Sequence, residues 1–310
     1  LSDAAFANVI EDHGDTDPAR RYKSLFFEAR DPSGTPNMGD GVSVAFSPDG
    51  IRWTKYEKNP VIKRSSDSHM LLGWDDLHST YVSYCRPSLH AGNKIRRIGR
   101  AESDDFINWS SIKDVLAPDN EDPIGTEFYG MPVFKYEDLY IGQLLAYHAP
   151  PEEQQIRFEG TTDIQLTSSR DGISWERIGN RKSFISNGPP GSIDHGGISA
   201  SRQPVLMGNE LWFYYSCSDQ SHGVTGRSGT ICLAKLRLDG FVSMDARTDI
   251  GTLTTQVMHC KGGLLSINAV AKKGMVGVAI LDESGIQYNG YSKQECAIFN
   301  GDFINHTMTW

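Results

Sequence analysis

Three carboxylic acids occupy comparable places in this sequence, each near the start of a segment that is typical of a β-strand. They are Asp67, Glu127 and Asp194. Acid/base chemistry needs one carboxyl that keeps its proton and another that stays ionised, and burial and neighbouring charges set such differences. Any one of these acids could simply accept hydrogen bonds from a turn. Because all three acids have the same position relative to the start of a predicted strand, a shared site is favoured.

Polar side chains with the chemistry of a ligand site accompany these acids. Near the strand starts, or at the ends of the strands that follow, the sequence places His69, Arg86, Tyr129, His148, His195 and Arg202, with Trp74 as a further aromatic. Such a mixture suits a hydroxyl-rich ligand. The alternative is a set of buried salt bridges between sheets. No cluster has the spacing of a metal centre, so we expect no cofactor, although a carboxylate-lined channel could hold a hard cation such as Ca²⁺.

One heptapeptide recurs three times, at residues 47–53, 103–109 and 169–175, always as S-x-D-[G/F]-I-x-W. Asp-Gly favours a tight hairpin in which Gly takes a positive φ. We expect the Trp after each turn to begin the next strand and to pack across the hairpin. The motif is therefore interpreted as structural; its alternative is a Trp surface for a sugar ring. Its spacing indicates a repeated supersecondary unit.

A second element, an aromatic strand, recurs between the turns at residues 21–27, 80–85, 139–147 and 211–216. Three copies follow another predicted strand, at residues 68–74, 125–134 and 198–206. Each unit thus has four antiparallel strands, as in a propeller blade, and about four blades are visible. The first strand of each blade would line the axis, where the acids would converge.

Composition agrees with an all-β chain that buries a large core. The 310 residues include 31 Gly and 14 Pro, and 38% are hydrophobic, with no apolar run long enough to span a bilayer. A net charge of −9 without a basic cluster argues against nucleic acids or anionic membranes as partners. The sequence does not indicate an oligomeric state. It begins at Leu1 without a signal sequence, which suggests an excerpt.

Five scattered cysteines indicate neither a disulfide framework nor a zinc site. Cys217 and Cys232 could face each other on neighbouring strands, and buried free thiols are the favoured interpretation.

The repeat changes character after Asp239, where an Asp-Gly turn survives but no Trp follows. Short alternating segments come next, at residues 252–257, 263–268, 275–281 and 304–310. They predict a β-sandwich. We therefore expect a propeller domain at residues 1–248 and a sandwich domain at 249–310, the latter continuing beyond Trp310.

These features together resemble a known group. The S-x-D-G-x-x-W hairpins, G-T-E-F-Y-G-M-P at residues 125–132 and R-L-D-G-F-V-S-M-D-A at 237–246 are similar to the five-bladed β-propeller glycosidases of glycoside hydrolase families 32 and 43. They are closer still to bacterial proteins described as similar to family 32. The resemblance covers most of the chain.

This resemblance implies a fold and residue roles. It implies a five-bladed type of propeller in which Glu127 is the general acid, because it lies at the matching loop. Asp67 would stabilise the transition state and orient the sugar, while Asp194 would be a second base or a hydroxyl ligand. The family's first-blade W-M-N-D-P-N sequence is not found, and its E-C-P motif is matched only loosely at residues 127–132. We expect the family's first blade, with its Asp, to lie before Leu1.

Two functions are therefore expected as alternatives. The first is a glycoside hydrolase acting on a poly- or oligosaccharide with the three acids. The second is a non-catalytic carbohydrate-binding propeller, favoured if the acid/base pair is incomplete. The resemblance also implies a secreted or periplasmic protein.

Overall fold

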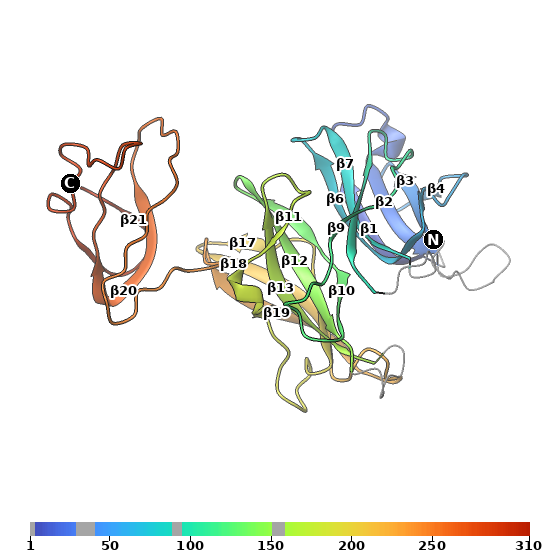
Figure 1. The fold of residues 1–310 in the computed structure, drawn as a ribbon. Helices are drawn as coiled ribbons and strands as arrows, with labels where there is room; N and C mark the ends of the chain where they lie inside the picture. The colour runs from blue at the N-terminus through green and yellow to red at the C-terminus, as the bar shows by residue number, and fades with distance from the viewer. Residues whose placement is uncertain (1–3, 29–40, 89–94, 151–158) are drawn as a thin grey trace. The chain divides into compact units, whose positions relative to one another are not determined.

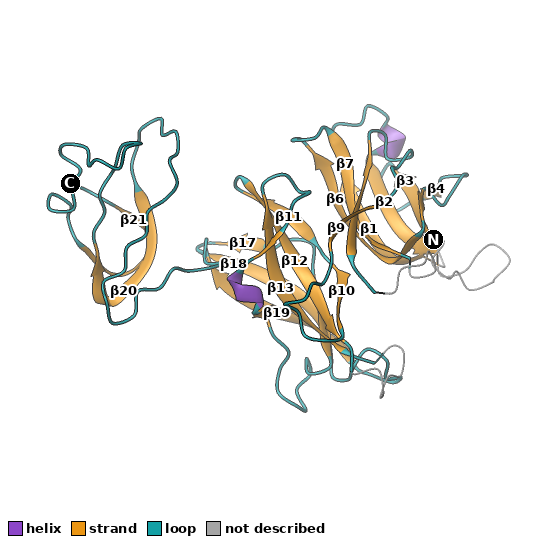
Figure 2. Cartoon of the chain, viewed as in Figure 1, coloured by secondary structure: helices purple, strands orange, loops and turns teal. Residues whose placement is uncertain are grey.

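The computed structural model describes residues 4–28, 41–88, 95–150 and 159–310. Strands dominate these residues, with short 3-10 turns at η1 (Pro18–Arg20) and η4 (Gly179–Arg181) (Figures 1 and 2). None of the helices in the described ranges is long and apolar enough to cross a membrane. The chain forms two compact units: Leu1–Pro204 with Phe213–Ala234, and Val205–Trp212 with Lys235–Trp310.

Three antiparallel sheets follow one another along the first unit (Figure 1). The first sheet comprises β1 (Ala4–Glu11), β2 (Tyr22–Glu28), β3 (Gly41–Ser47), β4 (Thr54–Lys55) and β5 (Ile62–Lys63). The second comprises β6 (Ser65–Asp75), β7 (Thr80–Pro87), β8 (Ile98–Ser103) and β9 (Lys113–Leu116). The third comprises β10 (Thr126–Gly130), β11 (Val133–Tyr136), β12 (Leu139–His148), β13 (Thr161–Ser169), β14 (Glu176–Arg177) and β15 (Ser183–Ile185).

A fourth sheet centres on β18 (Glu210–Ser218), which pairs with β16 (Gly197–Ala200), β17 (Val205–Met207) and β19 (Gly229–Arg237). These four sheets give an all-β fold with a four-blade propeller arrangement.

Cys217 and Cys232 face each other on neighbouring strands, as predicted, since their Sγ atoms lie 3.3 Å apart as free thiols. In the second unit, β20 (Ser266–Val276) pairs with β21 (Phe299–Thr307). The sandwich stays a prediction.

The strand pattern differs from the sequence expectation at two kinds of place. The inner strand β1 was not predicted, because its sequence AAFANVIE shows no clear alternation. The predicted strand 125–134 is in fact divided into β10 and β11, since Met131 and Pro132 interrupt it and Pro has no N–H for the ladder. The predicted strand 198–206 is likewise divided, into β16 and β17, next to Pro204.

The three S-x-D turns have the predicted form. Asp49 Oδ1 accepts hydrogen bonds from the backbone N–H groups of Ile51 and Arg52 at 2.9 and 2.7 Å. Gly50 and Gly172 have φ of +74° and +66°, as the turn requires. Strands β4 and β14 begin one residue after the Trp of their turns, rather than at the Trp as predicted, and β9 begins only at Lys113.

Strand register defines two ends of the blades. In the second sheet Ser65 pairs with Pro87, Asp75 with Thr80, and Tyr81 with Ser103. The end of β6 therefore lies beside the S-x-D turn that follows β8, and the start of β6 lies at the opposite end. We call these the turn end and the strand-start end. β1 is oriented alike, since its last residue, Glu11, pairs with the start of β2.

Strand β6 separates two hydrophobic cores. Leu71 belongs to the core with Leu25 and Val44 of the first sheet, whereas Leu72 belongs to the core with Phe128 and Leu144 of the third. Successive side chains point to opposite faces of a strand, so β6 buries one face against each neighbouring sheet. This packing fixes the inner strands β1, β6 and β10 relative to one another.

Candidate functional site

Asp67 forms an ion pair at the strand-start end. It lies near the start of β6 and pairs with Arg86 at the end of β7. The Arg86 guanidinium also donates to Ser66 Oγ at 2.8 Å and to the backbone oxygen of Tyr129 at 3.1 Å. It lies over the Tyr129 ring, 4.3 Å from the centroid. Because the Arg86 side chain is only 7% exposed, this group is held rigidly between the second and third sheets.

Glu127 forms a second ion pair nearby. Its carboxylate on β10 pairs with Arg96, which lies two residues before β8 and is buried. The Arg96 guanidinium lies 4.9 Å from the centroid of the Tyr147 ring and 5.6 Å from that of Tyr129. The backbone N–H of Phe128 donates to the Arg96 carbonyl at 3.0 Å, so the main chain also holds the arginine in place.

Aromatic side chains join the two ion pairs. The Tyr129 hydroxyl and His222 Nε2 share a hydrogen bond of 2.8 Å, and both rings lie 5.9 Å or less from the ring of Tyr147. We call the whole group the arginine–tyrosine cluster; it consists of Asp67, Arg86, Arg96, Glu127, Tyr129, Tyr147 and His222. The structure thus brings together Asp67, Glu127, Arg86 and Tyr129 from the sequence prediction.

Two polar atoms of the cluster are buried without hydrogen-bond partners among the described residues. They are Arg96 Nε and the Tyr147 hydroxyl. Burial raises the pKa of Tyr147, so its hydroxyl keeps its proton at neutral pH. An unsatisfied buried donor costs about 1–3 kcal/mol. A small rearrangement that offers these donors an oxygen acceptor would therefore be favourable.

Asp194 and His195 lie in the loop before β16 and have hydrogen-bond partners outside the cluster. Asp194 accepts hydrogen bonds from Ser192 Oγ at 2.7 Å and from the Tyr215 hydroxyl at 3.4 Å. His195 Nδ1 lies 3.4 Å from the backbone oxygen of Gly188. Within the described ranges, no hydrogen bond, ion pair or ring contact joins Asp194 to the arginine–tyrosine cluster.

The two other predicted histidines have local partners. His148 Nε2 lies 3.1 Å from Asp163 Oδ1, and Asp163 also accepts from Ser183 Oγ. His69 is 1% exposed, and its Nδ1 lies 3.0 Å from the backbone oxygen of Asp67. Burial lowers the pKa of His69 to about 4, so its ring is neutral at physiological pH.

Arg202 lies at the turn end, away from the acids. Arg202 follows the end of an inner strand, β16. The other predicted residues lie near the starts of inner strands, or at the ends of the strands that pair with the inner strands. The Arg202 guanidinium donates to the backbone oxygen of Leu72, near the end of β6. The expected convergence of all these residues at one place thus holds for only part of the set.

Sequence reasoning missed Arg96, Tyr147 and His222. Register explains Tyr147: it is the cross-strand partner of Glu127, whereas the predicted His148 is opposite Thr126. Side chains on one face of a sheet alternate with period two, so a shift of one residue exchanges the neighbours. Arg96 and His222 lie in loops that no sequence pattern relates to the strands.

Metal-ligating side chains do not gather in the parts of the chain that the structure describes. No group of three or more His, Cys, Asp or Glu side chains there could hold a metal ion. For the Ca²⁺ ion that the sequence left possible, the described residues therefore offer no identified ligand set.

Comparisons with known proteins give a fold and no family. No family model matches the sequence, and no curated protein matches it. An N-acetylgalactosamine deacetylase from F. plautii, solved with blood group B trisaccharide, is similar at a TM-score of 0.52 and 15% identity over 76% of this chain and 72% of that one. At this identity the likeness shows the fold alone.

Two further solved structures have lower scores. A beta-1,2-mannobiose phosphorylase from Listeria innocua, in complex with beta-1,2-mannobiose, has a TM-score of 0.46 and 15% identity, over 75% of this chain and 71% of that one. A Bombyx mori family 32 beta-fructofuranosidase, in complex with sucrose, has a TM-score of 0.44 and 15% identity, over 83% and 53%. Because both of these TM-scores are below 0.5, similarity of fold is stated for the deacetylase alone.

Proposed function

We propose that this protein acts on a poly- or oligosaccharide at the strand-start end, with the arginine–tyrosine cluster as its site. The observation that carries the proposal is that two acids from different blades, Asp67 and Glu127, belong to one partly buried group with aromatic rings and hydrogen-bond donors. Such a group offers donors, acceptors and apolar ring faces to a hydroxyl-rich ligand. The fold likeness to a deacetylase solved with a trisaccharide supports this ligand class.

The proposed reaction is glycoside hydrolysis. The bond from the anomeric carbon to the leaving oxygen breaks, that oxygen takes a proton from a carboxylic acid, and water supplies a hydroxyl to the carbon and a proton to the enzyme. Glu127 is the proposed acid, and Asp67 the carboxylate that stabilises the developing positive charge. Asp194 is proposed as an additional hydroxyl ligand or base from the neighbouring loop.

One observation favours the second candidate, a carbohydrate-binding propeller without turnover. Both acids pair with buried arginines. Each carboxylate is hydrogen-bonded to its guanidinium, whereas a general acid must contact the leaving oxygen of the substrate. Hydrolysis therefore requires the substrate to separate Glu127 from Arg96, while binding requires no such change.

The remaining expectations are proposals as well. We propose a family 32- or 43-like propeller of the five-bladed type, a sandwich at residues 249–310 after a propeller at 1–248, and a secreted or periplasmic location.

A panel of poly- and oligosaccharides, assayed for both binding and release of reducing ends, tests the proposal. Glu127→Gln keeps the shape of the side chain and removes the titratable proton. Glu102→Gln is the matched control, because Glu102 also pairs with an arginine, Arg100, at 2.7 Å. For a hydrolase, Glu127→Gln lowers turnover about 10²–10⁴-fold and keeps binding. Glu102→Gln changes neither.

The other outcomes are equally decisive. Binding without turnover by the wild type supports the binding module. Turnover that is unchanged in Glu127→Gln excludes the acid assignment. If no saccharide of the panel binds or reacts, the proposed function is wrong.

A further inference from the structure

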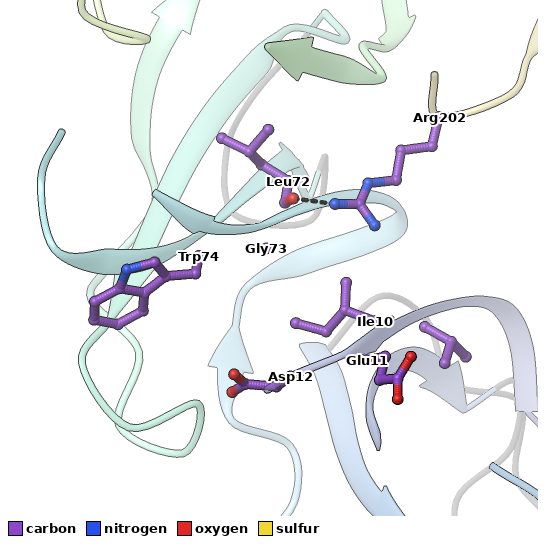
Figure 3. Close-up of a pocket in the computed structure, with 8 residues that line it drawn as sticks. Ile10, Glu11, Asp12, Leu72, Gly73, Trp74 and Arg202 are labelled. Carbon is purple, nitrogen blue, oxygen red and sulfur yellow. Dashed lines mark hydrogen bonds between the residues drawn. The ribbon is translucent and has the colours of Figure 1, made fainter. Parts of the chain in front are cut away.

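A cavity lies at the turn end of the inner strands, at the opposite end of β6 from the arginine–tyrosine cluster. Its volume is about 250 Å³, and it is lined by Val9, Ile10, Glu11, Asp12, Leu72, Gly73, Trp74 and Arg202 (Figure 3). β1 and its continuation, the end of β6, and the loop after β16 supply these residues. Pockets for drug-sized ligands measure about 300–1,000 Å³, so this one fits a single small ring.

Trp74 lines the cavity and carries an exposed aromatic ring. Its residue surface is 44% exposed, although large apolar side chains are usually buried. The ring packs edge-to-face on Tyr81, with centroids 5.0 Å apart and an interplanar angle of 75°. The Tyr81 hydroxyl in turn donates to Asp12. These contacts position the indole while much of it remains exposed.

Asp12 offers acceptors in the same cavity. Its Oδ2 accepts from Lys23 Nζ at 2.6 Å and its Oδ1 from the backbone N–H of Gly14 at 2.9 Å. Burial raises the pKa of Asp12, but the hydrogen bonds from Lys23 and Tyr81 outweigh it and leave the pKa below its usual value. Asp12 is therefore an ionised acceptor, and its Oδ1, which has one partner, keeps a further lone pair.

Arg202 offers donors from another side of the cavity. Its Nη2 donates to the Leu72 backbone oxygen (Figure 3). Of the described residues, no carboxylate pairs with it. Gly73 permits this approach: its φ is +97°, and a Cβ built there would lie 3.3 Å from Arg202 Nη2. The remaining guanidinium N–H groups are available to a ligand oxygen.

These features select a chemical class. An exposed indole face packs against the apolar C–H face of a sugar ring, and a fixed acceptor and a fixed donor suit hydroxyl groups. The lining carries two carboxylates, Glu11 and Asp12, and one guanidinium, Arg202, so we expect it to favour a neutral sugar over one that carries a carboxylate. We propose that this cavity binds one neutral pyranose unit, as a second saccharide site independent of the arginine–tyrosine cluster.

Titration with methyl glycosides of galactose, glucose and mannose tests the proposal. Saturation-transfer NMR and tryptophan fluorescence would report binding, with sodium glucuronate as the charged counterpart. Trp74→Ala should weaken binding of the neutral glycoside roughly tenfold or more. Trp74→Phe should retain part of the affinity. Arg202→Gln should weaken binding as well, whereas Arg52→Gln, at an 88% exposed arginine, should not.

Glu127→Gln separates this proposal from the proposed function, because it should leave the affinity of the turn-end site unchanged. Circular dichroism and thermal unfolding show whether each variant is folded. The inference is overturned if the wild type binds none of the three glycosides, if glucuronate binds as well as they do, or if folded Trp74→Ala binds like the wild type. Loss of glycoside binding in Glu127→Gln would also overturn it, by assigning the sugar to the other site.

Discussion

The aspartates of the S-x-D turns and the acids of the arginine–tyrosine cluster differ in how far away in the sequence their hydrogen-bond partners lie. Asp49, Asp105 and Asp171 each accept hydrogen bonds from backbone N–H groups two and three residues later. Asp67 and Glu127 pair with arginines 19 and 31 residues away in the sequence. A carboxylate with local partners specifies a turn, whereas one with distant partners is organised only when the sheets have packed.

The turns also contribute to packing between sheets. The carbonyl oxygen of Gly172 accepts hydrogen bonds from the Tyr84 hydroxyl at 2.7 Å and from Arg100 Nη1 at 2.9 Å, both in the second sheet. The backbone N–H groups of Ser174 and Ile173 hold the pKa of Asp171 far below its usual range. The turn end thus combines a local hydrogen-bond pattern with a few long-range contacts.

Asp75 lies at the turn end, yet two of its partners, Lys135 and Tyr140, are distant in the sequence. It therefore tests whether carboxylates at the turn end depend on local partners, and its replacement should have the largest effect. It is fully buried and bonded to Lys135 at 2.9 Å, His78 at 2.8 Å and the Tyr140 hydroxyl at 2.5 Å. We expect Asp75→Asn to lower the free energy of unfolding by about 3–5 kcal/mol, as breaking a buried ionic network does. Urea unfolding measures this, with the exposed neighbour Asp76→Asn as the control.

The network around Asp75 should also be sensitive to acid. Burial raises the pKa of Asp75, but the hydrogen bonds from Tyr140, Lys135 and His78 lower it from 3.8 to about 2. Its stabilising contribution is therefore complete above pH 4 and is lost as the pH falls from about 4 to 2. An unchanged acid transition in Asp75→Asn would contradict this.

His69 gives the next largest effect and lies at the strand-start end. Burial lowers its pKa from 6.5 to about 4, so the unfolded chain takes up a proton before the folded one. The contribution of neutral His69 is complete above pH 6.5 and is lost as the pH falls towards 4, by about 3 kcal/mol in all. His69→Phe should remove this dependence in thermal unfolding between pH 7 and 4. His13→Phe, at an exposed histidine, is the control.

Phe106 sharpens the comparison within the turns, because it occupies the Gly position of the motif with a φ of +66°. Its buried ring packs on Tyr81 and Trp109, at centroid distances of 5.2 and 5.5 Å. Relief of backbone strain would return about 1 kcal/mol, whereas loss of a buried Phe costs about 3–5 kcal/mol. Phe106→Gly should therefore destabilise by about 2–4 kcal/mol in urea unfolding. A stabilised variant would show that the strain dominates.

The smallest expected effect comes from a comparison of Asp171, a carboxylate with local partners, with Asp67, a carboxylate with a distant partner. Asp171→Ala should cost about 1 kcal/mol, as loss of a side chain that caps backbone N–H groups does. In double-mutant cycles, Asp67→Asn and Asp171→Ala should be additive within about 0.5 kcal/mol, because the sites share no partner. Asp67→Asn and Arg86→Gln should couple by about 1–3 kcal/mol. Equal coupling in both cycles would mean that the two ends are not independent.

The blade pattern could be predicted because its signals are local. The S-x-D turns and the aromatic strands β2, β7, β12 and β18 depend on residues within one hairpin, so their sequence is sufficient. Strand β1 could not be recognised, since its pairing with β2 and its Asn8 contact with the His69 carbonyl at 2.9 Å compensate for a weak pattern. Tertiary pairing overrode local propensity there.

From the sequence, one could predict at which end of the fold the candidate site lies, but not which side chains are neighbours there. The sequence by itself determined that Asp67 and Glu127 begin inner strands and that turns lie at the opposite end, because strand direction and turn chemistry are local properties. Only the tertiary structure decided that Arg86 and Arg96 pair with these acids, that Tyr147 rather than His148 faces Glu127, and that Arg202 and Trp74 line one cavity. Those choices depend on register and on packing between sheets, which no short stretch of sequence contains.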